Sequence, residues 1–428
     1  MSVKPSRTFA SPRMKSSPKT TVWAEFTPLA MKHKAVNLGQ GFPSWHPPEI
    51  VRRHAVEAVT DAMKPLNNQY ARPMGHVELV TPLAEAYTKK FGRTVDPLSN
   101  ILITNGSTQA LYCAFQTMLG NGEEVVMFEP YFDLYAPDVE MAGGKPVLIP
   151  LRPNAGGRTS QDWVYDKQEL ERAMRPQTKI IIVNTPQNVP GKVWTQEELE
   201  HIASLAKKHD VYVIMDEVYE YMVYDGLTHI HMATLPGMWE RTLTLCSAGK
   251  TLSATGWKIG WTVAPAEMIT VLLQTHSHQA FSVATPLQIA VGRSLTTYKD
   301  GQYYLNLRKE YQAKRDLLCK VLQAAGLNPI TPKGSYFVVA DISAVPESLY
   351  VNPTEKSVAK DWQFARWLTT EFKVTGIPVS AFYSQSKWAI AERYVRFAFC
   401  RELSELEEAG RRLLPLAAVI RKDRNAKL

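Results

Sequence analysis

The chain has 428 residues, of which 45% are hydrophobic and 21% are charged, and these proportions exclude a collagen-like or intrinsically disordered protein. No stretch approaches the roughly 18 consecutive apolar residues that a membrane helix requires, so we expect no membrane span. The formal net charge of +8 lies in the tails, because residues 1–20 contribute +5 and residues 421–428 contribute +3. The neutral body therefore gives no indication of nucleic-acid binding.

The two ends of the chain carry weak targeting features. Residues 1–20 are basic, rich in serine and free of acidic residues, as solvated tails and mitochondrial transit peptides are. The terminal Ala426-Lys427-Leu428 differs at one position from the peroxisomal signal Ser-Lys-Leu. We predict a protein of the cytoplasm or mitochondrion, with the peroxisome as the alternative. Four widely spaced cysteines are predicted to be free thiols in a reducing compartment: Cys113, Cys246, Cys319 and Cys400.

The chain begins with predicted helices and continues with alternating strands and helices. Residues 49–63 and 76–91 have the amphipathic pattern of helices. From residue 101 onward, short apolar runs alternate with helical stretches such as 108–119 and 196–209. Runs of this length, separated by helices, predict βαβ units and a mostly parallel sheet that is buried on both faces. The predicted strands are Ile101–Thr104, Val125–Phe128, Val147–Pro150, Lys179–Val183, Val211–Met215, Leu243–Cys246 and Ile259–Ala264.

The pattern changes after Ala264. It is helical up to about Ala325, and two predicted strands, Ser335–Ala340 and Tyr394–Phe399, then alternate with helices. We therefore predict an α/β fold with a large domain, built on a mostly parallel sheet, and a smaller α+β domain. The predicted division is a basic tail at 1–20, an arm on the side of the small domain and the substrate at 21–48, a large domain at 49–300, a small domain at 301–420 and a basic tail at 421–428.

Small and polar residues follow several of these strands, at the edge where an open α/β sheet binds its ligand. The turn Asn105-Gly106-Ser107-Thr108 opens a helix whose free backbone N–H groups suit phosphate, although such a turn is more often only an N-cap. Asp216 ends another strand, where its carboxylate could cap a helix, bind a metal or pair with a cationic ring nitrogen. A metal is the poorer interpretation, because the neighbouring Glu217 points the other way in an extended backbone.

Lys250 occupies an unusual position for a lysine. It follows the predicted strand Leu243–Cys246 and the small residues Ser247-Ala248-Gly249, whereas most lysines are solvated at the surface. Desolvation at a buried strand end would lower the pKa of its amine and make it available for Schiff-base chemistry.

Several short motifs, spaced along the chain, resemble those of one enzyme family. The patterns Asp216-x-x-Tyr219, Ser247-x-x-Lys250 and Gly256-Trp257-Lys258-x-Gly260-Trp261 resemble the pyridoxal-phosphate signature of fold-type I, class I/II aminotransferases, whose large domain carries a seven-stranded sheet. Further segments are similar to the branch of kynurenine aminotransferases, glutamine transaminase K and cysteine-S-conjugate β-lyases: Asn37–Pro43, Glu129–Tyr135, Gly334–Phe337 and Ile377–Tyr383. The motifs follow the family order over roughly residues 20–415, which makes the match specific.

The resemblance implies pyridoxal 5′-phosphate as the cofactor of the large domain. Lys250 would hold it as a Schiff base and move the proton of the substrate Cα, and Asp216 would pair with the pyridinium nitrogen. Tyr219 and Asn188 would bond its phenolate oxygen, and Lys250, Asp216 and Tyr219 form the predicted catalytic group. The other predicted contacts are Phe132 on the ring face and Ser107, Thr108, Ser247 and Lys258 at the phosphate. For Thr108 a purely structural role at a helix start competes.

The resemblance also assigns residues to the substrate. Arg396 matches the arginine that holds the α-carboxylate as a bidentate fork, while Trp23, Gly41 and Asn188 would line the substrate side. Considered singly, Arg396 could equally form a surface ion pair, and a structural role competes for Trp23 and Gly41. Tyr70 matches a tyrosine that reaches the phosphate of a partner subunit, which implies a homodimer, although a local contact would also explain it.

Two segments depart from the family pattern. The family's Asn-Pro-x-Gly loop reads Asn188-Val189-Pro190-Gly191 here, so either Val189 follows a cis bond that costs about 3–4 kcal/mol or the loop is shifted and trans. The segment Phe281–Pro286 lacks the aromatic–histidine pair of the mammalian-type enzymes, so their side-chain specificity cannot be transferred.

The predicted function is a PLP-dependent aminotransferase. It would move the amino group of an aromatic, sulfur-containing or glutamine-like L-amino acid to a 2-oxo acid by a ping-pong Schiff-base mechanism, with L-kynurenine to kynurenate as the favoured reaction. One alternative is β-elimination from cysteine S-conjugates, which needs only a leaving group at Cβ. A non-catalytic regulator with this fold is disfavoured, because the roughly 20 residues before the match are too few to fold as a DNA-binding module. No metal, nucleic-acid or membrane partner is expected.

Overall fold

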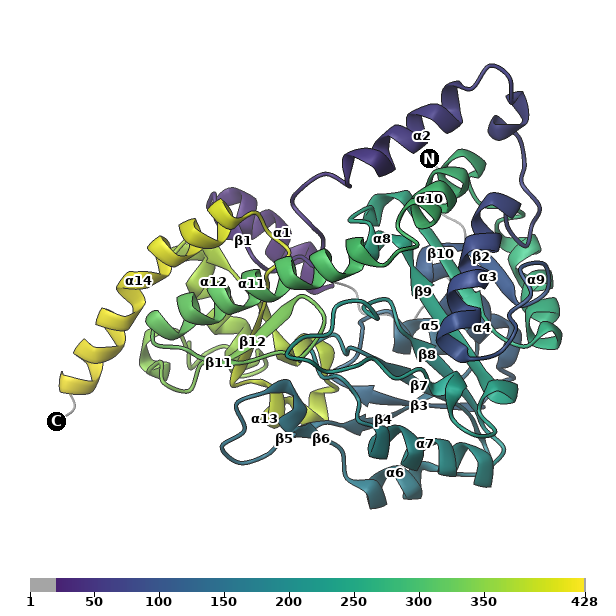
Figure 1. Ribbon diagram of the computed structural model, residues 1–428. Helices are drawn as coiled ribbons and strands as arrows, with labels where there is room; N and C mark the ends of the chain where they lie inside the picture. Colours follow the sequence, from purple (N-terminus) through teal and green to yellow (C-terminus); the bar gives the residue numbers. More distant parts are fainter. Residues whose placement is uncertain (1–20, 427–428) are drawn as a thin grey trace, which may run out of the picture.

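The computed structural model describes residues 21–426, and it contains a large α/β part and a smaller α+β part (Figure 1). The predicted tail 1–20 and the last two residues, with the targeting features assigned to them, lie outside the described residues. Between residues 21 and 426, no helix combines the length and the apolar character that crossing a membrane requires. All four cysteines are free, as predicted, and all except Cys319 are buried.

Seven strands form the large sheet, and each coincides with a predicted strand to within a few residues. Their spatial order is β2 (Ile101–Asn105), β10 (Ile259–Val263), β9 (Thr242–Ser247), β8 (Tyr212–Asp216), β7 (Thr178–Asn184), β3 (Glu124–Glu129) and β4 (Lys145–Pro150). The strands from β9 to β4 pair in parallel, whereas β10 is antiparallel to both of its neighbours. The predicted α/β class with a mostly parallel sheet is confirmed.

The single reversed strand has a simple cause. Residues 248–258 alone connect β9 to β10, and a parallel crossover requires a dozen or more residues. The connection instead folds as one helical turn, α8 (Ala248–Thr251), followed by a short 3₁₀ helix at Thr255–Trp257, and the chain returns antiparallel. Both ends of this connection therefore lie at the carboxyl edge of the parallel strands, which is the ligand-binding edge of such sheets.

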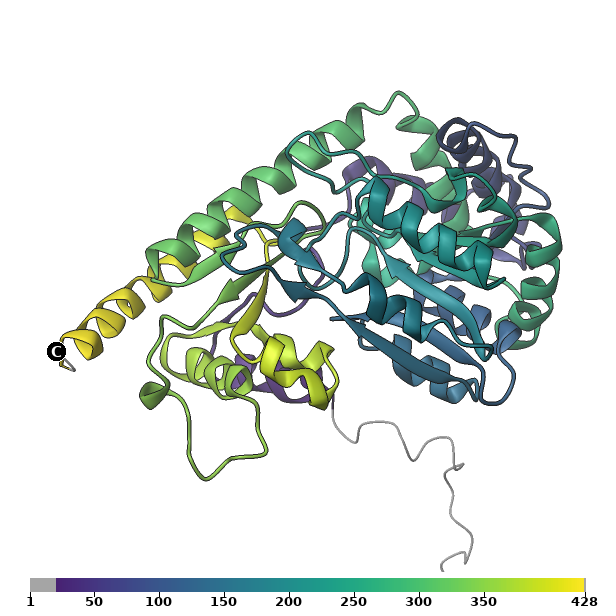
Figure 2. The same ribbon diagram turned by 90° about the horizontal axis from the view of Figure 1, so that it is seen from below.

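Helices cover both faces of the large sheet (Figures 1 and 2). Alternate strand residues explain why both faces are apolar: Ile180 and Ile182 pack toward one layer of helices, and Ile181 and Val183 pack toward the other. The first layer contains α4 (Gly106–Met118), α5 (Tyr135–Met141) and α9 (Ala266–Gln279). The second contains α6 (Lys167–Ala173) and α7 (Gln196–Lys208). Helices α3 (Val77–Phe91) and α10 (Thr285–Thr297) cover the end of the sheet at β2 and β10.

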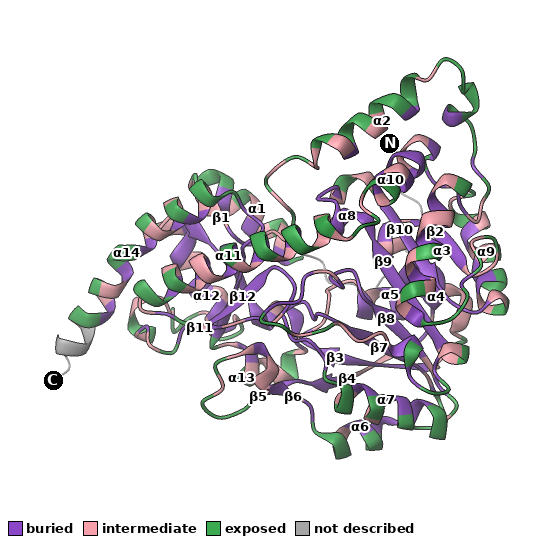
Figure 3. Ribbon diagram, in the orientation of Figure 1, coloured by how far each residue is buried: buried purple, intermediate pink, exposed green. Residues whose placement is uncertain are grey.

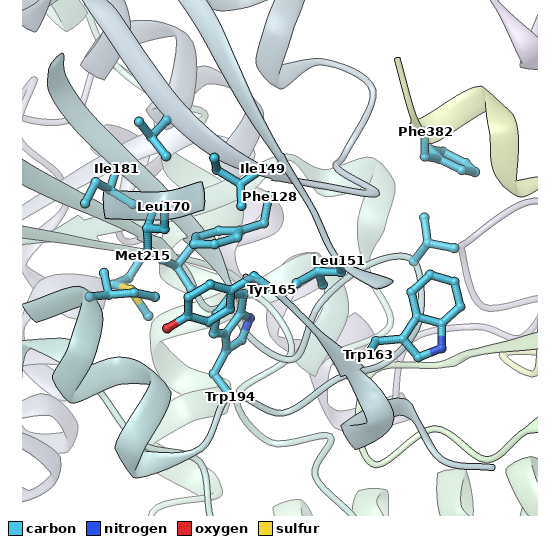
Figure 4. Packing of buried hydrophobic residues seen from close by; sticks show 14 of the residues in the cluster. Phe128, Ile149, Leu151, Trp163, Tyr165, Leu170, Ile181, Trp194, Met215 and Phe382 are labelled. Atoms are coloured by element: carbon cyan, nitrogen blue, oxygen red, sulfur yellow. The ribbon is translucent and has the colours of Figure 1, made fainter. Parts of the chain in front are cut away.

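An aromatic cluster joins the large sheet to the smaller part of the chain (Figure 4). Phe128 at the end of β3 contacts Trp194 and Tyr165, with ring centroids 4.6 Å and 5.3 Å away. Trp163, from the short β6 (Trp163–Val164) that pairs with β5 (Arg152–Pro153), packs on Tyr394 of the small sheet at 5.3 Å. This shared core fixes the position of the small sheet against the carboxyl edge of the large one.

The smaller part is built on a four-stranded antiparallel sheet. Its order is β11 (Asn328–Ile330), β12 (Phe337–Asp341), β15 (Tyr394–Ala398) and β14 (Ile377–Pro378). Helices α11 (Gln302–Ala324) and α14 (Leu403–Ala426) lie side by side along it (Figures 1 and 2). Its other helices are α12 (Lys360–Glu371) and α13 (Trp388–Ala391).

The arm, with α1 (Val22–Lys32) and β1 (Val36–Asn37), joins this part, because β1 pairs in parallel with β13 (Val374–Thr375). The boundaries at residues 48 and 300 stay predictions.

Helix α2 (Glu49–Thr60) stands at the top of the molecule and packs against α10 (Figures 1 and 3). Apolar side chains on and after it remain exposed, among them Val56, Val59 and Met63. Several uncovered apolar side chains on one helix often mark an interaction surface.

Candidate active site

One cavity at the carboxyl edge of the large sheet brings together all but one of the predicted site residues. It is lined by Trp23, Gly41, Ser107, Thr108, Phe132, Asn188, Asp216, Tyr219, Ser247, Lys250, Lys258 and Arg396. These residues come from the arm and both parts of the chain, at positions up to 373 residues apart. The sheet topology explains the meeting of those that follow the large strands, and the packing of the small sheet against the same edge adds Arg396. Their individual roles stay predictions.

Lys250 lies in α8, directly after β9. Its Nζ donates a hydrogen bond to the hydroxyl oxygen of Tyr336 at 2.8 Å. Desolvation lowers the pKa of this amine to about 8, although Asp216 nearby acts in the opposite direction. A substantial fraction of the amine is therefore neutral near pH 7–8, which a nucleophilic lysine requires.

Asp216 ends β8 and is buried. The hydroxyl of Tyr135 donates to its Oδ2 at 2.5 Å, while the side-chain amide of Asn184 donates to its backbone carbonyl at 2.8 Å. Burial raises the pKa of Asp216 to about 6, and the hydrogen bond from Tyr135 partly offsets this. The carboxylate is thus held rigidly, ionised above pH 6, and suited to a cationic partner in the cavity.

Tyr219 and Asn188 reach the cavity from the loops after β8 and β7. Tyr219 is buried, with its ring centroid 5.0 Å from that of Tyr336 in an edge-on arrangement, and burial raises its pKa. The loop of Asn188 is anchored by Asn184, whose Oδ1 accepts from the backbone N–H of Asn188 at 2.7 Å. The Asn188–Val189 bond is trans, because the only cis bonds among residues 21–426 precede Pro130 and Pro186. The alternative of a cis bond before Val189 is therefore wrong.

The start of α4 forms an anion cradle with the connection between β9 and β10. Gly106 adopts a left-handed φ of +75°, and a Cβ there would lie 3.0 Å from Lys258 Nζ. A Cβ on Gly260 would lie 2.5 Å from the backbone of Gly106 and Ser107, so this close approach requires glycine. Desolvation lowers the pKa of Lys258. Within residues 21–426 no carboxylate pairs with Lys258, so an anionic ligand can take that place.

Arg396 of β15 is buried, with 1% of its surface exposed, and no carboxylate among the described residues pairs with it. One terminal nitrogen donates to Asn188 Oδ1 at 2.8 Å and the other to the carbonyl of Gly39 at 2.9 Å, while Nε has no partner within residues 21–426. The guanidinium carbon lies 4.0 Å and 4.7 Å from the ring centroids of Phe337 and Phe382. Desolvation lowers the pKa of Arg396 to about 10. A buried, unpaired guanidinium in a cavity is built for a carboxylate ligand.

Trp23, Gly41 and Phe132 also line the cavity, and hydrogen bonds or ring contacts hold each of them. Trp23 Nε1 donates to Asp133 Oδ2 at 2.8 Å, which ties the arm to the large part. The carbonyl of Gly41 accepts from the Tyr336 hydroxyl at 2.5 Å. Phe132 lines the same cavity, with its ring centroid 5.7 Å from that of Tyr135.

Tyr70 is the exception. It is 82% exposed, lies outside the cavity and packs edge-on against Phe281, with ring centroids 5.2 Å apart. In a single chain it therefore contacts none of the other predicted site residues. Its predicted role needs a second subunit.

Four residues that support the site were not among the predicted ones: Tyr135, Asn184, Asp133 and Tyr336. Tyr135 bonds Asp216 across 81 positions, and Tyr336 bonds Lys250 across 86. Tyr135, Asp133 and Tyr336 lay within the quoted motifs, but the spacing of a motif does not show which side chains meet. Only the position of Asn184, directly after the predicted strand Lys179–Val183, could have indicated a place at the ligand-binding edge of the sheet.

The residues present fit pyridoxal phosphate. The cradle supplies the helix N-terminus, Ser247 and Lys258 for a phosphate dianion, Asp216 supplies a carboxylate for a ring cation, and Lys250 supplies an amine of lowered pKa for a carbonyl. Glycine at positions 106 and 260 provides the space that a Cβ would fill. The side chains and backbone groups of the cavity therefore match the phosphate, the ring nitrogen and the carbonyl of the cofactor.

Comparisons with known proteins agree with this geometry. The sequence profile described as aminotransferase class I and II matches residues 33–413. The chain is 42% identical to a kynurenine–oxoglutarate transaminase of Dictyostelium discoideum, over 96% of this chain and 97% of that protein. Among solved structures it is similar to Bna3p of Saccharomyces cerevisiae, with a TM-score of 0.91, 32% identity and coverage of 96% and 100%.

A second solved structure widens the range of donors within this fold. YbdL of Escherichia coli, described as having a methionine aminotransferase function, gives a TM-score of 0.86 at 31% identity, with coverage of 96% of this chain and 100% of that one. The profile match spans most of the chain, and it includes the cavity residues from Gly41 to Arg396. The chain belongs to the class I and II aminotransferase family.

Proposed function

We propose that this aminotransferase takes the amino group of L-kynurenine, and of other aromatic, sulfur-containing or glutamine-like L-amino acids, and passes it to a 2-oxo acid. The buried, unpaired Arg396 among aromatic rings, in the same cavity as Lys250, is the observation that carries the proposal. An α-carboxylate neutralises the guanidinium, and an aryl or thioether side chain suits the surrounding rings. The names of the similar transaminases support kynurenine as the donor.

Pyridoxal phosphate, when bound, supplies a carbonyl that condenses with amines and a ring that accepts electrons. The chain itself supplies the groups that move and hold protons. The neutral fraction of the Lys250 amine accepts the Cα proton as a general base and returns a proton as a general acid, and its pKa of about 8 suits both directions near neutral pH. Tyr336 holds that amine in place through the 2.8 Å hydrogen bond.

Asp216 and Arg396 hold the two charged ends of the reacting assembly. Asp216 keeps a ring nitrogen protonated, because Tyr135 orients its carboxylate and burial strengthens the attraction. Arg396 and Asn188, already hydrogen-bonded at 2.8 Å, bind the substrate carboxylate and so orient the Cα–H bond. Phe132, Phe337 and neighbouring rings exclude water from this region.

Asp216→Asn should retain cofactor and lose most activity, by about 10²-fold or more in kcat, because a neutral amide does not stabilise a protonated ring nitrogen as a carboxylate does. Steady-state kinetics and cofactor content measure the two effects separately. Asp138→Asn is the matched control, since Asp138 is also a buried carboxylate but lies outside the cavity. Near-normal turnover of the Asp216 variant would show that this residue has only a structural role.

Tyr336→Phe should lower kcat by roughly 5–10-fold. This factor corresponds to the roughly 1 kcal/mol that one hydrogen bond to the Lys250 amine contributes. Tyr311→Phe is the matched control, because Tyr311 is equally buried, its ring lies 6.1 Å from that of Tyr336, and its hydroxyl has no partner among the described residues. The pH profile of kcat should shift in the Tyr336 variant alone. Equal effects in both variants would mean that core packing, and not the bond to Lys250, is responsible.

The proposed donor is tested by comparing kcat/KM for a panel that contains L-kynurenine, L-phenylalanine, L-methionine, L-glutamine and L-aspartate. Kynurenine should rank among the best donors, and aspartate should be poor because aromatic rings surround Arg396. Assaying pyruvate and free thiol from a cysteine S-conjugate measures the competing β-elimination. A clear preference for aspartate, or elimination that exceeds transamination for every donor, would contradict the proposal.

We also propose that the active enzyme is a homodimer in which Tyr70 completes the partner's site. Tyr70 packs on the exposed Phe281, and the exposed apolar side chains of Met63 and Leu66 precede it by seven and four residues. A second copy would cover such uncovered apolar groups. Mixing inactive Lys250→Ala and Tyr70→Ala subunits should restore activity, because one site of each hybrid combines an intact Lys250 with the other subunit's intact Tyr70. A monomeric mass in solution, or no restoration on mixing, would contradict the proposal.

A further inference from the structure

A second cluster of titratable side chains lies behind the active site. Glu217 follows Asp216 directly, and its buried side chain points away from the cavity, as an extended backbone requires. There it meets two histidines of the loop that follows β8. His231 Nδ1 lies 2.5 Å from Glu217 Oε2, and His229 Nε2 lies 3.1 Å from the same oxygen. No local pattern predicts this group, because the histidines follow Glu217 by twelve and fourteen residues.

Several polar atoms of this cluster that could bind a metal have no hydrogen-bond partner among the described residues. Among residues 21–426, Glu217 Oε1 and both ring nitrogens of His229 are buried without a hydrogen bond, since the 3.1 Å contact lacks hydrogen-bond direction. Buried polar atoms are nearly always paired, with protein, water or a ligand. Glu217 is completely buried, and the side chain of His229 is 7% exposed. A carboxylate oxygen and one ring nitrogen of His229 both carry lone pairs, so together they would suit a ligand with positive charge.

The surroundings resemble those of a metal ligand. His231 presents Nδ1 to Glu217, and its other nitrogen lies 3.9 Å from Glu220 Oε2. Metal-bound histidines usually face a carboxylate with their second nitrogen, which orients the ring and raises its basicity. Lys90 Nζ, 2.6 Å from the same Glu220 oxygen, balances the charge of that carboxylate. Glu217 therefore remains the carboxylate that faces the histidines directly.

We propose that Glu217, His229 and His231 form a binding site for a divalent transition-metal ion of the zinc type. One ligand atom from each residue lies within 4.8 Å of the others, and small rotations bring them to the spacing of a tetrahedral site with Zn–N and Zn–O distances of about 2.0–2.2 Å. Two imidazoles and one carboxylate are ligands that Zn²⁺ accepts, and water can fill the fourth position. The side chains of His229 and His231 keep 7% and 11% of their surface exposed, so an ion would enter from their side of the cluster.

The ion would act on structure and not on the reaction. None of its three ligands lines the active-site cavity, so it cannot touch the substrate. It would fasten the loop that carries the histidines to the end of β8, and the adjacent Asp216 belongs to that end. A metal that binds only the folded chain stabilises it.

Zinc binding by the holoenzyme, freed of metal with a chelator, tests the proposal. Competition with a chromophoric chelator should reveal one saturable Zn²⁺ site per chain, and the melting temperature should rise on addition of Zn²⁺. His229→Ala and His231→Ala should each weaken binding by more than about 100-fold. Glu220→Gln should weaken it by about 10–100-fold, the usual loss for an outer-shell carboxylate. His278→Ala, at an exposed histidine of α9, should bind as the wild type does.

Cobalt provides a measurement that needs no variant. Co²⁺ in the wild-type site should give visible absorption bands of a four- or five-coordinate ion, without the near-ultraviolet band of a thiolate ligand. The absence of that band would exclude the nearby thiol of Cys246, whose Sγ lies 3.5 Å from Glu220 Oε1, as a ligand. Absence of one saturable site in the wild type would overturn the proposal. Unchanged binding in both histidine variants, or a thiolate spectrum, would overturn it as well.

Discussion

Lys250→Ala should abolish turnover, by at least about 10⁴-fold, while leaving the fold intact. No other amine that lines the cavity can replace Lys250 as the nucleophile and proton carrier. Lys258 lies at the anion cradle beside Gly106, whereas Lys250 donates a hydrogen bond to Tyr336 on the substrate side. Loss of a general acid–base group alone costs about 10²–10⁴-fold, and loss of the covalent attachment adds to this. Single-turnover and steady-state assays measure the effect, and circular dichroism and melting temperature check the fold.

Borohydride reduction provides the control for this prediction. In the wild type it should fix the cofactor onto a single peptide that contains Lys250, and in Lys250→Ala it should fix none. Because this labelling reports the attachment site directly, it does not depend on activity. Fixation on another lysine would contradict the role assigned to Lys250.

Arg396→Lys should lower kcat/KM for every amino donor and every oxo-acid acceptor. All substrates share the α-carboxylate, and a planar guanidinium meets both of its oxygens, whereas an ammonium acts as a point charge. Arg396 is buried and already oriented by Asn188 and the carbonyl of Gly39. Truncating one partner of such a desolvated pair costs roughly 2–5 kcal/mol, a loss of about 30-fold to several thousand-fold. Kinetics with several donors and two acceptors measure it.

Arg315→Lys is the matched control for the arginine variant. Arg315 is also buried, with 4% of its side chain exposed, but it pairs with Asp225 at 2.7 Å and lies outside the cavity. The Arg315→Lys substitution should change the free energy of unfolding and leave kcat/KM nearly unchanged. For Arg396→Lys, a loss confined to one substrate would show that this residue recognises a side chain. A loss of bound cofactor would show that it belongs to the cofactor site.

The sequence was sufficient for the elements whose signal is local. The central strands of the large sheet are mostly apolar because they are buried on both faces. The polar residues that follow these strands include Asp216 and Lys250. The ligand-binding edge follows from that topology. The motifs then added Arg396, whose strand is an ordinary apolar run and whose function no local pattern reveals.

The remaining features depend on contacts that sequence spacing does not encode. The two-residue strands β1, β5, β6, β13 and β14 are too short to produce an alternating pattern. The hydrogen bonds of Tyr135 and Tyr336 join distant segments that only the packed fold brings together. Tyr70 illustrates a different limit, because its predicted contact lies on another subunit and no single chain contains it.

The half-reaction with L-kynurenine tests the central claim most directly. The holoenzyme is mixed with L-kynurenine in the absence of any oxo acid, and the cofactor absorbance and kynurenate are measured together. The account predicts that about one equivalent of kynurenate forms per active site, that the absorbance changes in parallel, and that an added 2-oxo acid restores the original spectrum. Absence of kynurenate from a fully loaded enzyme, or kynurenate without a reversible change of the cofactor spectrum, would contradict it.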